Sequence, residues 1–454
     1  MCLGGTRADR SGESGLVTAG VSSLQGDARR AVVAGTIGNV LEWYTFAVYG
    51  YLAPTIGPLF FPSEDRVSST LGAYGVFAVG YLMRPFGAIV LGRVGDRTGR
   101  RAMMVWSICL MGIASLLVGL LPTHATLGIW APVALTVLRM AQGFSVGGEF
   151  TGSMTYLTEV SPPGRRGVFS SLATVGGLAG MFLGGFSSWA LTASLGDEGV
   201  AAWGWRVPFL LGLPIALGGL WLRRRIPETK ERAAAPVSWK HGGGLRTHLR
   251  TILWMIALVT GANVLFYTAF VYAPEAAVAH KAEGAAAVQA ITTVTLALQA
   301  FAIVLGGLLA DRFGRRTVAV WGGIACAVLA WPAVALLLGE GEMFGWITAV
   351  FPMLDATIIR FWVGELPLTI AIGIIFGVQG VMIAESVTSE LRCSLVSIGY
   401  GLSIACFAGT APVFSTWLQE RLHLPDAIGW YCALWCVLAV WAALRSRETK
   451  PART

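Results

Sequence analysis

Glu42, Arg139 and Glu149 are ionisable side chains inside long apolar stretches of this sequence, and Arg84, to which we assign no role, is another. A charged group at bilayer depth costs at least about 2.5 kcal/mol on insertion scales, and such groups are usually retained for ions, substrates or a partner charge. A guanidinium such as that of Arg139 can bind a carboxylate through two parallel hydrogen bonds. A carboxyl such as Glu42 or Glu149 can take up and release a proton. A buried structural network is the alternative for Glu42, Arg139 and Glu149.

Polar and aromatic residues accompany these charges at helical spacing. Gln142 follows Arg139 by one turn, whereas Glu149 lies roughly 15 Å further along the axis, so Arg139 and Glu149 cannot pair within one helix. Aromatic rings could face a quaternary ammonium group by cation–π attraction, and ordinary packing is their alternative role. The candidate substrate- and proton-binding residues are Glu42, Trp43, Tyr44, Arg139, Gln142, Glu149, Asn263, Tyr267, Gln299 and Gln379.

The composition indicates that these residues are positioned by helices in a lipid bilayer. With 55% hydrophobic and 13% charged residues in 454 positions, the chain has more apolar side chains than a soluble domain can bury. A helix of roughly 20 apolar residues spans a bilayer. Lipid cannot hydrogen-bond to backbone N–H and C=O groups, so these groups must bond to one another within the helix. Twelve such runs lie at 31–53, 68–91, 102–121, 127–156, 167–194, 205–222, 251–273, 287–310, 317–339, 366–386, 393–418 and 427–444.

The basic residues predict the orientation of these helices. Most of the 33 Lys and Arg residues lie in the first 30 positions, in the loops that follow even-numbered runs, and after residue 445. By the positive-inside rule, both termini and these loops face the cytoplasm of a plasma membrane. The net charge of +8 therefore reflects topology and attraction to anionic lipid, and we expect no nucleic-acid partner.

A repeated block divides the chain into two halves. GRVGDRTGRR at 92–101 returns as GLLADRFGRR at 307–316, and each copy follows the second run of its half. A long polar connector separates the halves. The expected parts are a disordered cytoplasmic tail at 1–30, a six-helix bundle at 31–222, a cytoplasmic linker at 223–250, a second bundle at 251–444 and a cytoplasmic tail at 445–454.

The repeated block resembles the loop motif of the major facilitator superfamily. GNVLEWYTFAVYGYLAP, YLMRPFGAIVLGRVGDRTGRR, LRMAQGFSVGGEFTG, WGWRVPF and RETKP further resemble the metabolite:proton symporter family, above all its proline and glycine betaine transporters. The resemblance implies an all-α membrane protein with twelve transmembrane helices in two pseudo-symmetric six-helix bundles. It also implies proton-coupled uptake of a small zwitterion or carboxylate by alternating access.

The charged loops are expected to form a clasp, and the resemblance implies that this clasp holds the cytoplasmic side shut in the outward-open state. Asp96 can accept hydrogen bonds from the positive N-terminal end of a neighbouring helix, and Arg100 can pair with Glu159. Arginines that only set topology are the alternative, but they would not explain the repeated Asp and Gly. The candidate clasp residues are Gly92, Asp96, Arg97, Gly99, Arg100, Arg101, Glu159, Arg165, Gly307, Asp311, Arg312, Gly314, Arg315, Arg316, Glu385 and Arg392.

Two features depart from the family pattern. The family usually has an acid where this chain has Thr45. Glu42 or Glu149 therefore carries the proton instead, or the missing acid never did, or the chain is a uniporter. The segment 339–366 is longer than the family suggests, and its spaced aromatic and charged residues predict a short amphipathic helix at the outer interface.

Other functions fit the sequence less well. An exporter of the same superfamily is the main alternative, and a receptor that binds without transport is a second. We expect no enzyme, because no nucleophile and base stand together, and no ATP-driven pump, because the chain lacks a GxxxxGK[ST] loop. The seven cysteines form no metal-binding pattern, so neither metal nor cofactor is expected beyond the proton gradient. The partners are a small molecule, a proton and lipid, and a monomer suffices.

Overall fold

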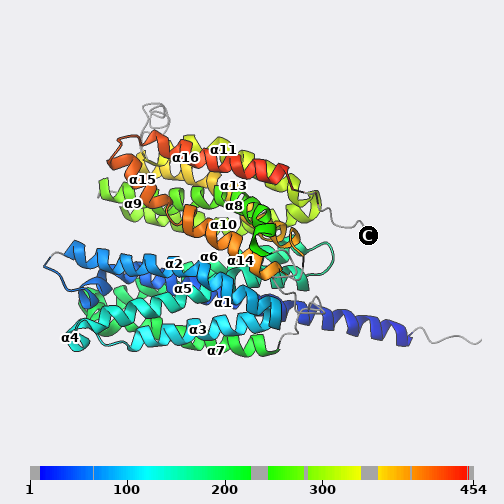
Figure 1. Ribbon diagram of the computed structural model, residues 1–454, viewed down its shortest axis with the longest axis horizontal. Coiled ribbons are helices and arrows are strands. Elements are labelled where there is room, and N and C mark those ends of the chain that lie inside the picture. The colour runs from blue at the N-terminus through cyan, green and yellow to red at the C-terminus, as the bar shows by residue number, and fades with distance from the viewer. Residues whose placement is uncertain are drawn as a thin grey trace, which may run out of the picture.

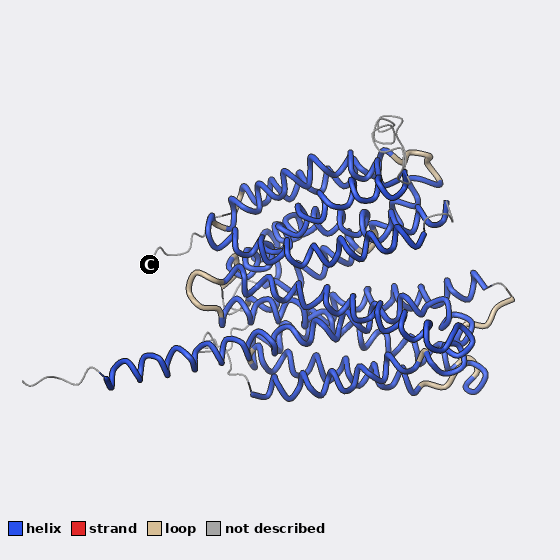
Figure 2. Tube along the Cα trace, turned by 180° about the vertical axis from the view of Figure 1, so that it is seen from behind, coloured by secondary structure: helices blue, strands red, loops and turns tan. Residues whose placement is uncertain are grey.

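The computed structural model describes residues 11–64, 66–225, 244–280, 285–338, 356–388, 391–446 and 448. Within these ranges the chain is helical and contains no strand. The helices form two bundles, one from each half of the chain, whose long axes run side by side (Figures 1 and 2). The first residues of α1 and the end of α16 lie at the same end of the molecule.

The first half contains α1 (Ser11–Phe60), α2 (Arg66–Thr98), α3 (Arg100–Leu120), α4 (His124–Leu127), α5 (Trp130–Val160), α6 (Arg166–Gly199), the π-helical segment η1 (Val200–Gly204) and α7 (Arg206–Arg225). The second half contains α8 (Gly244–Tyr267), η2 (Thr268–Tyr272), α9 (Ala273–His280), α10 (Ala285–Phe313), α11 (Arg315–Leu338), α13 (Ala356–Glu385), α14 (Arg392–Ser403), η4 (Ile404–Ala408), α15 (Ala411–Glu420) and α16 (Asp426–Leu444).

The helices match the expected transmembrane architecture. Among the described residues, ten helices are long and apolar enough to cross a membrane. The other two of the twelve spans are α1 and α5, whose buried polar residues, such as Glu42 and Arg139, lower the mean hydropathy. Large apolar side chains such as Trp106, Phe301 and Trp321 are exposed on the outside of the bundles, where lipid would cover them.

Within each half, a glycine brings two helices into backbone contact, and the helix pairs occupy equivalent places in the two halves. A Cβ atom at Gly87 of α2 would overlap the carbonyl oxygen of Phe144 in α5. In the second half, a Cβ atom at Gly306 of α10 would overlap the carbonyl oxygen of Ile374 in α13. Small residues allow such close packing in membranes, where the hydrophobic effect does not drive helix association. The two halves therefore repeat in packing as well as in sequence.

The structure corrects three expectations. Residues 11–30 are helical rather than disordered, because helix formation is cooperative and extends from the adjoining span of α1. Arg223 and residues 244–250 belong to α7 and α8, which leaves 226–243 of the expected linker outside the described residues. Residues 356–365 of the expected interfacial segment are the first turns of α13, and its earlier residues lie outside the described ranges.

Candidate functional site

The two loop motifs use glycine for conformation and for close approach. Gly99 has φ 103° and ψ 158°, and Gly314 has φ 99°, which side chains rarely tolerate. These residues separate α2 from α3 and α10 from α11. A Cβ atom at Gly92 would lie 2.8 Å from Cα of Ser394 in α14, and one at Gly307 would lie 2.7 Å from the carbonyl oxygen of Gly167 in α6. Each motif therefore touches the opposite half.

The motif aspartates accept hydrogen bonds from helix N-termini of the opposite half. The Asp96 carboxylate accepts from the backbone N–H groups of Cys393 and Ser394, both at 3.0 Å, at the start of α14. The Asp311 carboxylate accepts from the first turn of α6 in the same way, at 2.8 and 3.0 Å. Free N–H groups and the helix dipole both favour an anion there. The contact predicted for Asp96 is present.

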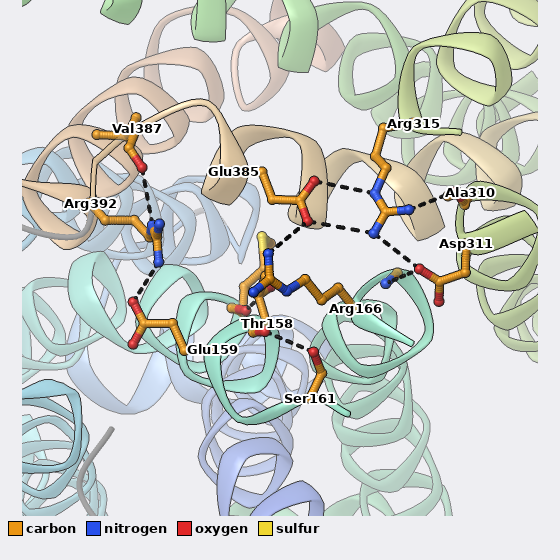
Figure 3. Close-up of polar contacts among 12 residues, drawn as sticks. Thr158, Glu159, Ser161, Arg166, Ala310, Asp311, Arg315, Glu385, Val387 and Arg392 are labelled. Atoms are coloured by element: carbon orange, nitrogen blue, oxygen red, sulfur yellow. Dashed lines mark hydrogen bonds and ion pairs between the residues drawn. The ribbon is translucent and has the colours of Figure 1, made fainter. Parts of the chain in front are cut away.

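Ion pairs beside each of the two motif loops complete the clasp. Arg100 donates to Glu159 at 3.2 Å, as its sequence position suggested, and Arg392 of the other half donates to the same carboxylate at 2.8 Å. In the matching arrangement, Arg315 lies 3.2 Å from Glu385, and Arg166 of the first half reaches Glu385 at 3.4 Å (Figure 3). Each glutamate therefore joins a motif arginine of its own half to an arginine of the other.

Several candidate clasp residues take no part in these contacts between the halves. Arg97 and Arg312 are exposed, and Arg312 lies over the ring of Phe313. Arg101 donates to the carbonyl oxygen of Arg224 at 2.7 Å within the first half. Arg165 is exposed at the start of α6, and its neighbour Arg166 makes the ion pair instead. Arg316 is half-buried on α11.

A cavity of about 870 Å³, including space open to solvent, lies between the two halves. Five of the predicted residues line it: Glu42, Trp43, Asn263, Tyr267 and Gln379. On the lining, the halves meet where the Thr151 and Ser397 hydroxyls lie 2.5 Å apart, and where the Phe150 and Tyr400 rings lie 5.1 Å apart. The cavity therefore has walls from both bundles, as alternating access requires.

Glu42 and Arg84 bring an acid and a basic group into this cavity. Glu42 is 1% exposed, and neither of its carboxylate oxygens has a hydrogen-bond partner among the described residues. Arg84, on α2, is 5% exposed, lines the same cavity, and leaves Nε and Nη2 without described partners. A buried charged group without a hydrogen-bond partner costs free energy. A solute, a water molecule or, for Glu42, a proton that binds here would relieve that cost.

The remaining cavity residues supply rings and amides. The Nε1 of Trp43 and the hydroxyl of Tyr267 have no described hydrogen-bond partner. Asn263 of α8 and Gln379 of α13 both donate to the carbonyl oxygen of Val259 in α8, at 2.8 and 3.3 Å, so this one carbonyl group orients both side-chain amides. The π-helical segments η2 and η4 begin beside Tyr267 and at Ile404, and such irregular turns are frequent at functional sites.

Arg139, Gln142 and Tyr44 do not line the cavity. Arg139 donates to Oε1 of Gln142 at 2.7 Å, and its guanidinium lies 4.1 Å from the Tyr49 ring centroid and 4.7 Å from that of Phe46. The Tyr44 hydroxyl donates to the carbonyl oxygen of Pro208 at 2.8 Å. The structure thus gives these three predicted residues packing contacts within the first bundle.

Glu149 and Gln299 also lie outside the cavity. Glu149 forms a fully buried ion pair with Arg223 of α7, and Gly38 of α1 makes room for it, since a Cβ atom there would overlap both groups. Gln299 is buried on α10, and its amide has no hydrogen-bond partner among the described residues. The cavity therefore contains Glu42 but not Glu149, which are the two acids that the sequence left as alternatives.

Sequence reasoning missed three buried charges. Arg84 stood out as a charge inside an apolar run but received no role, and Arg223 was assigned to the linker because it starts a run of arginines. Glu365 was placed at the interface, yet it is buried in α13 and accepts hydrogen bonds from Thr292 at 2.7 Å and Thr295 at 2.6 Å. The signal in each case was an ionisable residue within reach of a long apolar run.

Thr45, at the position of the usual family acid, has a local role. It is buried, and its hydroxyl donates to the carbonyl oxygen of Glu42 at 2.8 Å. Among the described residues no group of three His, Cys, Asp or Glu could hold a metal ion.

Known proteins are similar to this chain in sequence and in architecture. The sequence model of the Major Facilitator Superfamily matches residues 35–351. The proline/betaine transporter of Salmonella typhimurium is 32% identical over 442 residues, which cover 93% of this chain and 84% of that protein. The alpha-ketoglutarate permease of Escherichia coli is 32% identical over 436 residues, which cover 94% and 96%. The solved structure of the proton:xylose symporter XylE superposes with a TM-score of 0.72 at 16% identity, covering 94% of this chain and 97% of XylE.

Proposed function

Because the chain belongs to the major facilitator superfamily of membrane transporters, we propose that it takes up a small organic metabolite together with a proton by alternating access. The substrate is a zwitterion of the proline or betaine type, or a carboxylate, as the names of the relatives suggest. The proton gradient is the energy source, and the proposal includes no cofactor.

One observation carries the proposal: an acid without hydrogen-bond partners lies in the cavity between the halves. Glu42 lines that cavity, and its oxygens have no described partner. A carboxyl in this position can be protonated from one side of the membrane and deprotonated from the other as the cavity changes its access. Glu149 is less suitable because Arg223 already neutralises it. We therefore assign proton transfer to Glu42.

The clasp supplies the second requirement, a gate that opens and closes. Asp96 and Asp311 bind helix N-termini of the opposite half, and Glu159 and Glu385 bind arginines across the same boundary. All these contacts must break when the halves separate at this end. The clasp is therefore formed in the state that closes the cytoplasmic side and is broken in the inward-open state.

The orientation follows from the basic residues. We place the clasp, the linker and both termini in the cytoplasm, with the protein in the plasma membrane. One chain contains both halves and the whole cavity, so a monomer suffices.

An exporter or a uniporter of the same superfamily remains a second candidate. An exporter of apolar drugs needs a broad apolar cavity, whereas this cavity holds Glu42 and Arg84. Uniport agrees with Thr45 at the place of the family acid, but it leaves the free carboxyl of Glu42 without a role.

Purified protein in vesicles with an alkaline lumen tests the proposal. Labelled proline, glycine betaine, citrate, 2-oxoglutarate and shikimate are added outside, and uptake is followed with and without a protonophore. We expect at least one solute to accumulate above its external concentration only while the pH gradient lasts. Uptake that never exceeds equilibration supports a uniporter, and binding without flux supports a receptor.

A further inference from the structure

We propose that Arg84 is the residue that binds the substrate carboxylate, and that its positive charge offsets the ionised Glu42 carboxylate and the substrate carboxylate in turn. This inference rests on the proposed function, since it concerns the same cavity. It selects solutes with a single carboxylate and assigns carboxylate recognition to α2 rather than to Arg139 of α5.

Arg84 is positioned but not satisfied. Its guanidinium carbon lies 3.9 Å from the ring centroid of Tyr81, 4.6 Å from that of Phe46 and 5.7 Å from that of Trp43. Rings at these distances hold the planar guanidinium by cation–π attraction without using its N–H groups. Nε and Nη2 have no described hydrogen-bond partner although the residue is almost fully buried. Nε and one terminal nitrogen form an edge that suits a carboxylate.

Arg139 cannot do the same. Its Nε and Nη2 also have no described partner, but its Nη1 donates to Gln142, the rings of Tyr49 and Phe46 lie against it, and it is absent from the cavity lining. A solute in the cavity would have to displace that packing to reach it. Arg84 lines the cavity directly.

The charges on the described lining limit the substrate. Arg84 is its one cation, and Glu42 is its one acid. A solute with one carboxylate can bind Arg84 and place a cationic end against the aromatic faces of Trp43 or Tyr267. A second carboxylate would find no second cation on the described lining, and a buried charge without a counter-charge is costly. The lining therefore favours a zwitterion over a dicarboxylate.

The same arrangement links substrate to proton. Glu42 lines the cavity together with Arg84 of α2 and Tyr400 of α14, and Glu149 of α5 is the other acid close enough to act on it electrostatically. Glu149 is paired with Arg223, so Arg84 is the cation available to an ionised Glu42. When a substrate carboxylate takes Arg84, the Glu42 carboxylate loses its counter-charge and a proton binds there. When the substrate leaves, Arg84 again favours ionised Glu42 and the proton is released.

Equilibrium binding to the purified full-length protein tests this without requiring transport. The probes are glycine betaine, choline, which keeps the quaternary ammonium but has a hydroxyl group in place of the carboxylate, and 2-oxoglutarate. In the wild type we expect glycine betaine to bind at least about tenfold more tightly than choline, because a hydrogen bond to a charged group is lost. Arg84→Lys should reduce this preference at least about threefold, since an ammonium lacks the two-pronged geometry. Arg139→Lys, a matched buried-arginine control, should leave the ratio unchanged.

The outcomes separate the inference from the proposed function. Equal binding of glycine betaine and choline by the wild type, tighter binding of 2-oxoglutarate, failure of the wild type to bind either carboxylate, or an unchanged ratio in Arg84→Lys would each overturn the inference, even if vesicles accumulate solute. A ratio that depends on Arg84 together with no flux in vesicles would uphold the inference and reject symport. Because ratios within one protein are compared, partial loss of folded protein does not affect the result.

Discussion

At the residue scale, the central feature is a pair of opposite charges that share a cavity. Glu42 and Arg84 both line it, and both have polar atoms without described hydrogen-bond partners. Glu149 is already paired with Arg223, and Arg139, which donates to Gln142 but leaves Nε and Nη2 without described partners, does not line the cavity. Only a charge that is not neutralised by its surroundings can respond to a solute or a proton.

Replacement of Glu42 should separate transport from coupling. Glu42→Gln keeps the shape but cannot ionise, so the variant should exchange substrate across the membrane yet fail to accumulate it. With one proton per substrate and a gradient of one pH unit, the wild type can reach an accumulation of about tenfold, because 1.4 kcal/mol corresponds to that ratio. The first measurement is the steady-state ratio of internal to external substrate concentration in vesicles. Counterflow at equal pH on both sides measures exchange.

Glu365→Gln is the matched control for Glu42→Gln. Glu365 is also fully buried, but it lies on α13, is hydrogen-bonded to Thr292 and Thr295, and does not line the cavity. The Glu365→Gln variant should accumulate substrate like the wild type. Loss of accumulation in Glu365→Gln, with Glu42→Gln unaffected, would move the proton site to the second bundle.

The sequence alone shows which charged residues lie in helices, but it does not show which face of each helix points to the cavity. Arg84 and Arg139 look equivalent in the sequence, each an arginine within an apolar run. Which one faces the cavity depends on the packing of α2 against α5 and on the rings that surround each guanidinium. That information comes from tertiary contacts, so the sequence favoured Arg139 and left Arg84 without a role.

At the element scale, helix ends hold the two halves together. The contacts of Asp96 and Arg100 were predictable because the motif is repeated and because an acid is stabilised at a helix N-terminus. The participation of Arg166 rather than Arg165 was not predictable, since adjacent residues point to different sides of a helix. The two motif loops thus have nearly the same geometry, with φ near 100° at both Gly99 and Gly314.

Asp96→Asn should weaken the clasp. The substitution keeps one acceptor oxygen but removes the negative charge at the start of α14, an interaction worth up to about 2 kcal/mol in partly buried settings. The closed-to-open ratio should fall by up to about thirtyfold, and uptake should slow without loss of membrane insertion. The exposed Asp197→Asn is the control. Normal uptake kinetics in Asp96→Asn would remove the clasp from the account.

Gly99→Ala tests the conformation of the loop. A side chain at φ 103° and ψ 158° costs about 1–3 kcal/mol, so the variant should have a lower thermal unfolding temperature in detergent. Gly218→Ala is the matched control, because that glycine is helical and has no atom within 4 Å of an added Cβ. It should be as stable as the wild type or slightly more so. Equal unfolding temperatures for all three proteins would contradict the structure of the loop.

At the scale of the whole molecule, the architecture was the most predictable part. Long apolar runs and a repeated charged block are properties of the sequence itself, and lipid permits few folds. The expected spans correspond to helices throughout the described residues, with differences at their ends, such as the start of α13 at Ala356 rather than near residue 366. The charges of Arg360 and Glu365 hid that start, because the hydrogen bonds that Glu365 accepts from Thr292 and Thr295 are not visible in the sequence.

The topology gives a prediction about the whole molecule. In a variant without native cysteines, Arg421→Cys lies at one end of the bundles and Arg165→Cys at the other, and both positions are exposed. A membrane-impermeant thiol reagent should label Arg421→Cys in intact cells and Arg165→Cys only after permeabilisation. The opposite pattern would invert the orientation and place the clasp outside the cell.

Proton movement driven by substrate tests the central claim most directly. Vesicles with equal pH on both sides and a pH indicator in the lumen receive the transported solute outside. The account predicts that the lumen acidifies in the wild type as the solute enters and that Glu42→Gln produces no pH change. Solute entry without acidification in the wild type, or equal acidification in Glu42→Gln, would contradict it.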